Sequence, residues 1–265
     1  MNNSAAAPHI SIRGLTMAYG SFVIQRDLSF DIGRGDIFVI MGGSGCGKST
    51  LLKHMLGLIE PAAGEILYSG ENFTRASAQQ RDVIRRRWGI TYQTGGMFSA
   101  MTLAENVALP LQLYSEYSPD EIADIVAYKL ALVGLAGFQA FYPAEISGGM
   151  LKRAALARAI ALDPEILFFD EPSAGLDPIS SRLLDDLILE LKESTGATVV
   201  MVTHELPSIF AIATNSVYLD AASRTMIDHG DPAWLRDHSH QAVVREFLTR
   251  GSPASTASTR SSQHE

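Results

Sequence analysis

Hydrophobic and polar positions alternate along residues 9–40, where HISIRGLTMAYG is followed by VIQRDLSFDIG. A two-residue period is typical of strands that bury one face, so we predict short antiparallel strands here. Three later runs, GDIFVIM, ILFFDE and TVVMVTH, are apolar on both faces. Such strands, alternating with helices, indicate a parallel sheet covered on both sides. The predicted fold class is therefore α/β, with a mixed or parallel core sheet beside an antiparallel β subdomain.

Helical periodicity dominates the middle of the chain, over about residues 94–165. One helix there begins after Ser118, a good N-cap residue, with Pro119 at its first position. Another helix is expected from about residue 180 to 193, and residues 216–229 resemble a hairpin. The middle region is therefore predicted to form a helical subdomain.

The chain is predicted to form one domain over residues 9–250, after an N-terminal tail of residues 1–8. Its last element is predicted to be an amphipathic helix over about residues 232–249. The apolar residues of that helix either dock on another subunit or pack on their own domain. Residues 251–265 are rich in Ser and Thr and hold no large apolar residue, which predicts a disordered tail.

Composition narrows the possible classes of function. Of the 265 residues 46 % are hydrophobic and 19 % charged, an ordinary balance for a globular protein. The net charge of −8 disfavours nucleic acid as the main partner, because affinity for phosphates needs a basic face. One cysteine excludes a disulfide framework and a Cys-rich zinc site. We find no apolar run near the roughly 20 residues of a membrane span and no pattern of a signal peptide.

The segment GGSGCGKST lies where a buried strand is predicted to turn into a helix, and it matches the phosphate-loop pattern G-x-x-x-x-G-K-[ST]. Its glycines let backbone N–H groups converge on phosphate oxygens, and the helix N-terminus adds partial positive charge. Lys48 would hold the β- and γ-phosphates, and the Ser49 hydroxyl would ligate Mg²⁺. The residues predicted to contact the nucleotide here are Gly42, Gly43, Ser44, Gly45, Cys46, Gly47, Lys48, Ser49 and Thr50.

Two carboxylates end the apolar strand ILFFDE. Asp170 lies at the carboxyl end of that strand, where α/β folds bind ligands, and would hold the Mg²⁺ of a nucleotide. Glu171 is the candidate for polarising the attacking water, with a solvated carboxylate as the alternative. The segment Ser147-Gly148-Gly149 stands at a helix start 23 residues before Asp170 and offers a second anion cradle. Together these residues predict an NTPase.

Gln93 after one strand, Asp177 in SAGLD and His204 after the third apolar strand complete a set of motifs. The set resembles the ABC-transporter ATPase family, with all motifs in order over about residues 9–230. This resemblance implies a P-loop NTPase fold of the ABC type with a helical signature subdomain. It also implies ATP hydrolysis coupled to transport, with ATP and Mg²⁺ as ligands.

The resemblance implies a role for each matched residue. Tyr19 would stack on adenine, Gln93 would reach Mg²⁺ or the attacking water, and His204 would touch the γ-phosphate. The Ser147-Gly148-Gly149 signature would contact ATP held by the other subunit, and Asp177 would cross the dimer interface. Read singly, these are a surface tyrosine, a polar strand end and a structural histidine. The implied catalytic set is Glu171, His204 and Gln93, and the implied Mg²⁺ ligands are Ser49, Gln93 and Asp170.

Three features leave alternatives open. The signature reads ISGGM where the family usually has LSGGQ, so Met150 removes a side-chain hydrogen bond to ATP. The Cys46 thiol either has its pKa lowered by the helix N-terminus or simply fills a tight turn. The run Arg85-Arg86-Arg87 is either a solvated helix end or a contact to anionic lipid or a partner.

A narrower resemblance is to phospholipid-transport ATPases of the Mla type, carried by QTGGMF from residue 93, ISGGM with KRAALARAIALDPE, and GLDPIS. It implies a homodimer on a separate permease at the cytoplasmic face of the inner membrane. It also implies a periplasmic MCE-domain lipid binder and a small STAS-domain protein. The alternative is an ABC ATPase that energises import of another solute, such as an amino acid, or export of a hydrophobic toxicant.

Overall fold

The computed structural model describes residues 7–93 and 95–250, and its strands form two sheets. The first sheet is antiparallel, in the order β2-β1-β4-β5, and comprises β1 (Ile10–Tyr19), β2 (Phe22–Ile32), β4 (Ala63–Tyr68) and β5 (Glu71–Asn72). The second has the order β10-β9-β3-β8-β7-β6 and comprises β3 (Ile37–Gly42), β6 (Trp88–Thr91), β7 (Ile166–Asp170), β8 (Thr198–Val202), β9 (Asn215–Asp220) and β10 (Thr225–Gly230). Only β10 pairs antiparallel in it, so the predicted fold class is confirmed.

The helices follow the predicted order along the chain. They are α1 (Lys48–Met55), α2 (Ala78–Arg85), α3 (Leu103–Tyr114), α4 (Pro119–Leu132), α5 (Gly148–Ala159), α6 (Pro178–Thr195), α7 (Leu206–Ile212), α8 (Pro232–His238) and α9 (Ala242–Thr249), with a 3₁₀ turn at Pro143–Glu145. Ser118 caps α4 as predicted, because its hydroxyl accepts the Glu121 N–H. The predicted tail 251–265 and most of the tail 1–8 lie outside the described residues.

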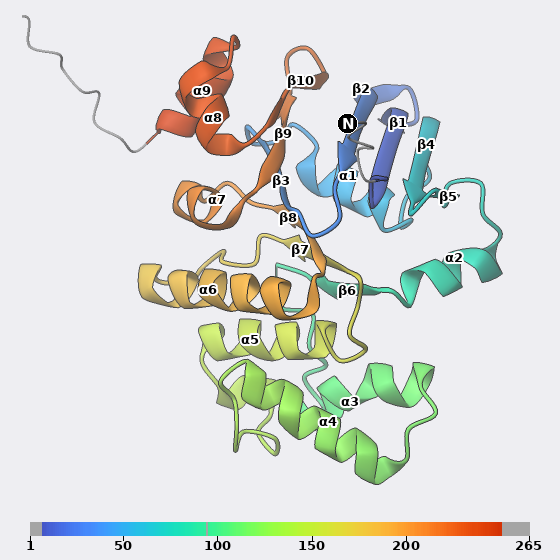
Figure 1. Cartoon of the computed structure of the whole chain (residues 1–265), viewed down its shortest axis with the longest axis vertical. Helices are drawn as coiled ribbons and strands as arrows, with labels where there is room; N and C mark the ends of the chain where they lie inside the picture. Colours follow the sequence, from blue (N-terminus) through green and yellow to red (C-terminus); the bar gives the residue numbers. More distant parts are fainter. Residues whose placement is uncertain (1–6, 94, 251–265) are drawn as a thin grey trace, which may run out of the picture.

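The six-stranded sheet separates two hydrophobic clusters. Along β3, Phe38 and Ile40 pack on one side, against α1 and the antiparallel sheet. Val39 and Met41 pack on the other, where α5, α6 and α7 lie. Figure 1 shows these layers, with α1 beside β1 and β2 and α6 on the opposite side of the strands. The continuous apolar strands are thus buried on both faces, as the pattern predicted.

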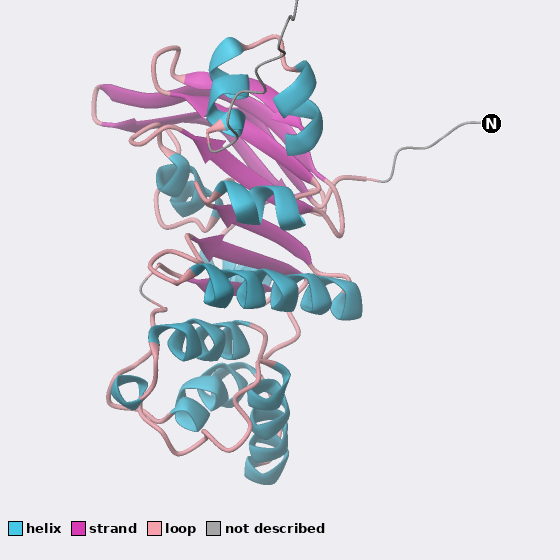
Figure 2. Cartoon of the chain, turned by 90° about the vertical axis from the view of Figure 1, so that its left-hand side faces the viewer, coloured by secondary structure: helices cyan, strands magenta, loops and turns pink. Residues whose placement is uncertain are grey.

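Helices α3, α4 and α5 form the end of the molecule farthest from the antiparallel sheet, and Figure 2 shows this end built from helices and loops. Leu103 and Val107 of α3 and Val126 of α4 are buried in the same hydrophobic cluster as the face of the six-stranded sheet on which α5, α6 and α7 lie. A capping box at Thr102 and Glu105 fixes the start of α3.

The last predicted helix, over residues 232–249, is wrong as a single element, because the chain breaks it into α8 and α9. Ser239 ends α8, and its hydroxyl donates to Asp228 of β10 and accepts the Gln241 N–H at 3.1 Å. These bonds turn the chain between the helices. Phe247 of α9 is buried against Tyr218 of β9, with ring centroids 5.4 Å apart, so the helix packs on its own domain.

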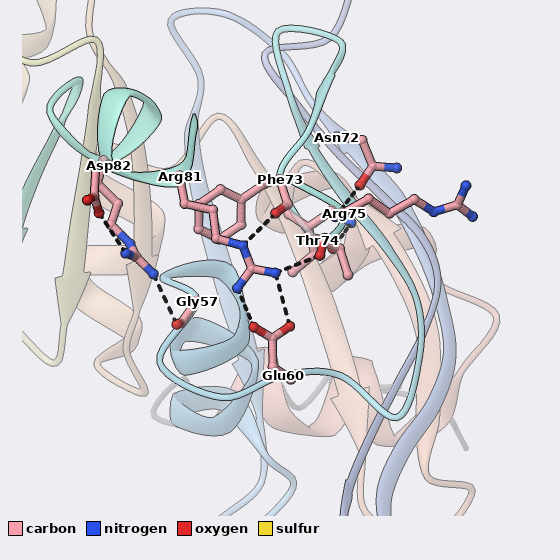
Figure 3. A network of polar contacts seen from close by, with 10 residues as sticks. Gly57, Glu60, Asn72, Phe73, Thr74, Arg75, Arg81 and Asp82 are labelled. Carbon is pink, nitrogen blue, oxygen red and sulfur yellow. Dashed lines mark hydrogen bonds and ion pairs between the residues drawn. The ribbon is translucent and has the colours of Figure 1, made fainter. Parts of the chain in front are cut away.

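A partly buried arginine, Arg81, ties α2 to the loops that flank the antiparallel sheet (Figure 3). The Arg81 guanidinium donates to the carbonyl oxygens of Phe73 at 3.0 Å and Thr74 at 2.6 Å. It also donates to both carboxylate oxygens of Glu60. Arg81 and Arg85 both lie over the Phe73 ring, at 5.2 and 5.6 Å from its centroid.

The run Arg85-Arg86-Arg87 makes contacts within the chain at the end of α2, where Arg86 is exposed and Arg85 and Arg87 are half-buried, so this helix end is solvated in part. Arg85 donates to the Gly57 carbonyl at 3.3 Å, and Arg87 donates to Glu71 at 2.9 Å. The Arg86 guanidinium lies 5.3 Å from the centroid of the Tyr114 ring.

Arg81→Met is expected to lower the free energy of unfolding by about 2 kcal/mol, because carbonyl oxygens and a carboxylate lose a charged donor. The Arg81 guanidinium also holds the pKa of the Glu60 carboxyl below its ordinary value. A lowered folded-state pKa stabilises the fold above the unfolded pKa, and this is lost as pH falls through the folded value.

The loss caused by Arg81→Met should therefore shrink as pH falls below about 4. Urea unfolding at pH 7 and at pH 3.5 measures both effects. Arg75→Met, which removes a more exposed arginine of the same region, is the control and should change stability by less than about 1 kcal/mol. An Arg81→Met loss no larger than that of the control would contradict the prediction.

Candidate functional site

A cavity of about 1030 Å³ opens at the carboxyl ends of β3 and β8. Its lining comprises Tyr19, Phe22, Ile24, Gly42, Gly43, Ser44, Gly45, Gly47, Lys48, Ser49, Thr50, Glu171, His204, Glu205, Leu206, Pro207, Phe247 and Arg250. The structure thus brings together most of the predicted nucleotide contacts with Glu171, one of the two predicted acids, and with His204, the predicted γ-phosphate contact. The position at the strand ends is the usual ligand site of α/β sheets.

The loop between β3 and α1 needs glycine at two positions. Gly42 has a φ of 147°, and a β-carbon there would lie 2.4 Å from the Leu219 carbonyl oxygen. Gly47, the N-cap of α1, has a φ of 103°, and a β-carbon there would lie 2.7 Å from Ile24. Any other residue would push the loop away from β2 and β9. The two glycines that define the motif are therefore required by the backbone.

Lys48 and Ser49 open helix α1 at the floor of the cavity. The Lys48 ammonium donates to the carbonyl oxygens of Gly42 at 3.0 Å and Gly43 at 3.1 Å, which holds it over the loop. The Ser49 hydroxyl donates to the Asp170 carboxylate at 3.2 Å. A hydroxyl and a carboxylate in contact are oxygen ligands of the kind that Mg²⁺ bound to a nucleotide uses. The donor set therefore fits the predicted Mg²⁺ site at these two residues.

Glu171 and His204 are in direct contact. The Nδ1 atom of His204 lies 2.9 Å from one carboxylate oxygen of Glu171, and its Nε2 atom lies 3.7 Å from the Glu205 carboxylate. The side chain of Glu171 is 13 % exposed and that of His204 is 59 % exposed. The second Glu171 oxygen is buried and has no partner among residues 7–93 and 95–250. Glu171 lines the cavity, where its carboxylate can accept a proton from a water molecule.

The backbone of Glu171 is left-handed, with a φ of 51°. Its N–H donates to the Val202 carbonyl at 2.8 Å, and its own carbonyl accepts the Ala174 N–H at 3.2 Å. Residues other than glycine rarely adopt this conformation, and such outliers cluster at functional sites. The turn sends Glu171 toward His204, while Asp170 contacts Ser49.

The surroundings of Cys46 contradict one of the two interpretations of this residue. Burial raises the pKa of its thiol, which is 1 % exposed, so the lowered pKa considered from the sequence is wrong. Desolvation of the thiolate outweighs the helix terminus and the Lys48 charge. The side chain fills the turn beneath Gly42, and the thiol does not belong to the described lining of the cavity.

Gln93 lies apart from the described lining of this cavity. It follows β6, its side chain is exposed, and its backbone carbonyl accepts a hydrogen bond from the Lys152 ammonium. Burial lowers the pKa of Lys152, and the charges of Glu171 and Asp170 oppose this change. Lys152 thus joins helix α5 to Gln93, and the sequence analysis missed it because an isolated lysine carries no motif.

The signature segment and Asp177 both act as helix N-caps. The Ser147 hydroxyl accepts the Met150 N–H at the start of α5. The Asp177 carboxylate accepts the N–H groups of Ile179 and Ser180 at 3.0 Å at the start of α6. Both segments are exposed and lie outside the described cavity lining. Their predicted contacts to a second subunit stay predictions.

The walls of the cavity include residues that the sequence did not reveal. Phe22, which starts β2, is one of them, and it lies near Tyr19, the predicted adenine contact, which ends β1 and is 53 % exposed. On the other side, Phe247 and Arg250 come from α9 and the residue after it. The hairpin pattern could have indicated Phe22. No motif marks the residues of α9, because only the packing of the C-terminal helix on β9 brings them there.

Comparison with known proteins gives two kinds of match. The family model described as ABC transporter matches residues 25–174. The intermembrane phospholipid transport system ATP-binding protein MlaF of Escherichia coli K12 is 39 % identical over 239 residues, which cover 90 % of this chain and 88 % of that protein. MlaF of Haemophilus influenzae is 42 % identical, with coverage of 90 % and 89 %. The probable ribonucleotide transport ATP-binding protein mkl of Mycobacterium leprae is 40 % identical and is covered over 68 % of its length.

Solved structures share the fold. The dimeric ATP-binding cassette MJ0796, in a post-hydrolysis state bound to ADP and Pi, matches with a TM-score of 0.76 and 28 % identity, covering 84 % of this chain and 98 % of that one. The cbiO1 protein of Clostridium perfringens, part of the transporter complex cbiONQ, matches with a TM-score of 0.79 and 26 % identity, covering 86 % and 90 %.

Proposed function

The chain belongs to the ABC transporter family of ATPases, and from this premise we propose that it hydrolyses ATP to drive a phospholipid transporter. The observation that carries this proposal is the identity of 39–42 % to two MlaF proteins over 88–89 % of their lengths. The contact between Glu171 and His204 at the phosphate loop supports the hydrolytic part, at 2.9 Å.

We assign the cavity to ATP, with the adenine against Tyr19 and the phosphates over the loop from Gly42 to Thr50. Lys48 binds the β- and γ-phosphates, and Ser49 and Asp170 supply oxygen ligands to Mg²⁺. Glu171, which lines the cavity, takes a proton from the attacking water through its carboxylate.

His204 contacts the γ-phosphate and orients the Glu171 carboxylate through their hydrogen bond. A side chain held in one direction by a hydrogen bond loses less freedom when the substrate arrives, which favours reaction. Gln93, outside the cavity in this structure, is assigned to the same site only in a closed dimer, with Mg²⁺ or the water as its partner.

ABC cassettes work as dimers with membrane permease components, and we propose a homodimer for this chain. The signature segment Ser147-Gly148-Gly149 is exposed apart from the cavity of its own chain, so it is free to contact ATP on a second copy. A two-fold axis makes two such sites from two identical chains. Met150 has no polar donor, so the backbone and Ser147 supply this contact.

A groove of about 400 Å³ supports a permease partner. It lies between α3 and the segment after β6 and includes Tyr92, Phe98, Leu113 and Tyr114, which are all exposed. Across the described residues, none of the helices is both long and apolar enough to cross a bilayer. We propose that a cytoplasmic segment of the permease fills the groove, which places the chain at the inner face of the membrane. The groove includes Tyr92, the residue before Gln93, so a permease contact there adjoins the residue that we assign to the catalytic site of the closed dimer.

Two substrate classes compete for this chain. The mycobacterial relative is named for ribonucleotide transport, and its 40 % identity lies between the 39 % and 42 % of the two MlaF proteins. This chain spans about two thirds of that relative but nearly nine tenths of the MlaF proteins. The match in length favours phospholipid, with an MCE-domain lipid binder and a STAS-domain protein as further partners. The transport of amino acids or hydrophobic toxicants has no comparable support.

Purification of the tagged chain from native membranes is expected to recover a permease, an MCE-domain protein and phospholipid, measured by mass spectrometry of proteins and lipids. Leu113→Arg, which places a charge in the groove, should reduce recovery of the permease at least tenfold. Leu183→Arg, on the exposed face of α6, is the matched control and should retain it. Recovery of a periplasmic solute-binding protein in place of the MCE-domain protein would overturn the lipid proposal and leave the ATPase standing.

A further inference from the structure

Gln25 is a polar residue in the interior of β2, beneath the phosphate loop. Its side chain is fully buried, at 0 % exposure, and Leu28 and Phe30 follow it in the same strand among the apolar core. Its amide nitrogen donates to the backbone carbonyl oxygens of Cys46 at 2.7 Å and Asp220 at 3.0 Å. Both partners only accept hydrogen bonds, so the nitrogen of the amide must face them.

The Cys46 carbonyl belongs to the same peptide group as the Gly47 N–H. In a planar trans peptide the C=O and N–H bonds point in opposite directions. The chain has no cis peptide bond among the described residues. Gly47 lines the cavity, whereas Gln25 lies behind it, outside the described lining. Holding the carbonyl from behind therefore directs the Gly47 N–H toward the cavity.

This peptide group is joined to Gly47, and glycine has more backbone conformational freedom than any other residue type. Gly47 has a φ of 103° and no β-carbon to fix its orientation. A β-carbon at Gly47 would lie 3.5 Å from Cγ of Gln25, so the two residues are packed together. The Gln25 amide removes this rotational freedom before a nucleotide arrives.

We propose that Gln25 is a positioning residue of the phosphate loop, which presets the Gly47 N–H for a phosphate oxygen of the nucleotide. The inference rests on the assignment of this cavity to ATP. The second hydrogen bond, to Asp220 at the end of β9, fixes the amide itself. The antiparallel sheet thus holds the adenine side of the cavity through Tyr19 of β1 and one donor of the phosphate side through Gln25 of β2.

The test compares a ligand that has phosphates with one that has none. Gln25→Met keeps an unbranched side chain of similar length and removes the donor. Its dissociation constant for MgADP is expected to rise about tenfold, because one preset donor is lost. Its dissociation constant for adenosine should change less than about twofold, because Tyr19 is untouched. Both constants are measured by competition against a fluorescent nucleotide.

Ser216→Ala is the matched control. The Ser216 hydroxyl is also fully buried and donates to the Gly230 carbonyl at 2.7 Å, but at the far end of β9 from the loop. The control should lose stability in urea like Gln25→Met and keep the MgADP affinity of the wild type. Equal weakening of MgADP and adenosine in Gln25→Met, or an unchanged MgADP affinity, would overturn the inference alone. A wild-type chain that binds no MgADP would overturn the nucleotide site as well.

Gln25→Glu gives a second readout if Gln25→Met does not fold. A carboxyl group donates to a carbonyl only when it is protonated, and burial raises its pKa. The MgADP affinity of this variant, relative to the wild type at the same pH, should therefore rise as pH falls from 8 to 5.5. A ratio independent of pH would count against the proposed role.

Discussion

Glu171→Gln is expected to lower the rate of ATP hydrolysis by about 10²–10⁴-fold, the usual contribution of a general base, while MgATP still binds. Glutamine keeps the size of the side chain and its hydrogen bond to His204, but its amide does not accept a proton at neutral pH. The Glu171 carboxylate at the cavity wall is the group whose basicity is lost. The affinity for MgATP should stay within about threefold, because a residue that acts in the transition state adds little to ground-state binding.

Phosphate release measures the rate, and equilibrium binding of a fluorescent ATP analogue measures the affinity. Glu205→Gln is the comparison, because its carboxylate also lies near His204, at 3.7 Å, but makes no hydrogen bond to it. The loss in that variant should stay below about tenfold. If Glu171→Gln turns over at nearly the wild-type rate, Glu171 is not the base.

The same variant tests the dimer. Because hydrolysis is blocked, ATP should hold two copies together, and size-exclusion chromatography with MgATP should show a dimer that ADP does not produce. A monomer under both conditions would contradict the assignment of the signature segment to a second copy.

Lys48→Ala is expected to weaken MgATP binding about a hundredfold, because a charged donor to phosphate oxygens typically contributes about 1.5–3 kcal/mol. The ammonium group lies over the loop, held by the carbonyl oxygens of Gly42 and Gly43. Its removal also leaves those carbonyls and the phosphates without a shared cation. Hydrolysis at subsaturating ATP should fall at least in proportion to the lost affinity.

Lys53→Ala is the control for this change. Lys53 lies on the same helix, is exposed in its last turn, and contacts neither the loop nor the described lining of the cavity. Its removal changes the net charge equally and should leave MgATP affinity within about twofold, since exposed charges are screened. Equal losses in the two variants would mean that general charge, and not the Lys48 contact, binds the phosphates.

Motifs with fixed spacing predicted the core of the site well. The loop from Gly42 to Thr50, Asp170 and Glu171 each follow an apolar strand, and strand ends on one edge of a sheet must converge. The sequence could also separate the two acids, because successive residues at a strand end point in different directions. In the structure Asp170 contacts Ser49, and Glu171 contacts His204.

Contacts between segments far apart in the chain could not be predicted in this way. Gln25 reads as one polar position in an alternating strand, and only the packing of β2 beneath the loop brings its amide to Cys46. The break between α8 and α9 at Ser239 depends on a hydrogen bond to Asp228 in β10, so helical periodicity alone could not predict it. Arg81 and Glu60 are 21 residues apart, and no local pattern joins them.

A polar residue can cap a helix of its own chain or contact a second subunit, and the sequence alone does not distinguish these roles. Asp177 was predicted to cross a dimer interface, and in the single chain it caps α6 through Ile179 and Ser180. An aspartate before Pro at a helix start is a common N-cap, so the local chemistry explains it without a second subunit. The two roles are compatible if one carboxylate oxygen has a lone pair left for the partner.

At Glu171 the requirements of catalysis and of thermal stability oppose each other. A left-handed backbone at a residue with a β-carbon costs roughly 1 kcal/mol, and glycine would adopt it without that strain. The chain keeps a carboxylate where glycine would make the fold more stable, as active sites often do. A library of variants selected only for thermal tolerance would therefore enrich glycine at this position and lose turnover. Any stabilised form of this protein intended for transport must be selected on its rate of ATP hydrolysis as well.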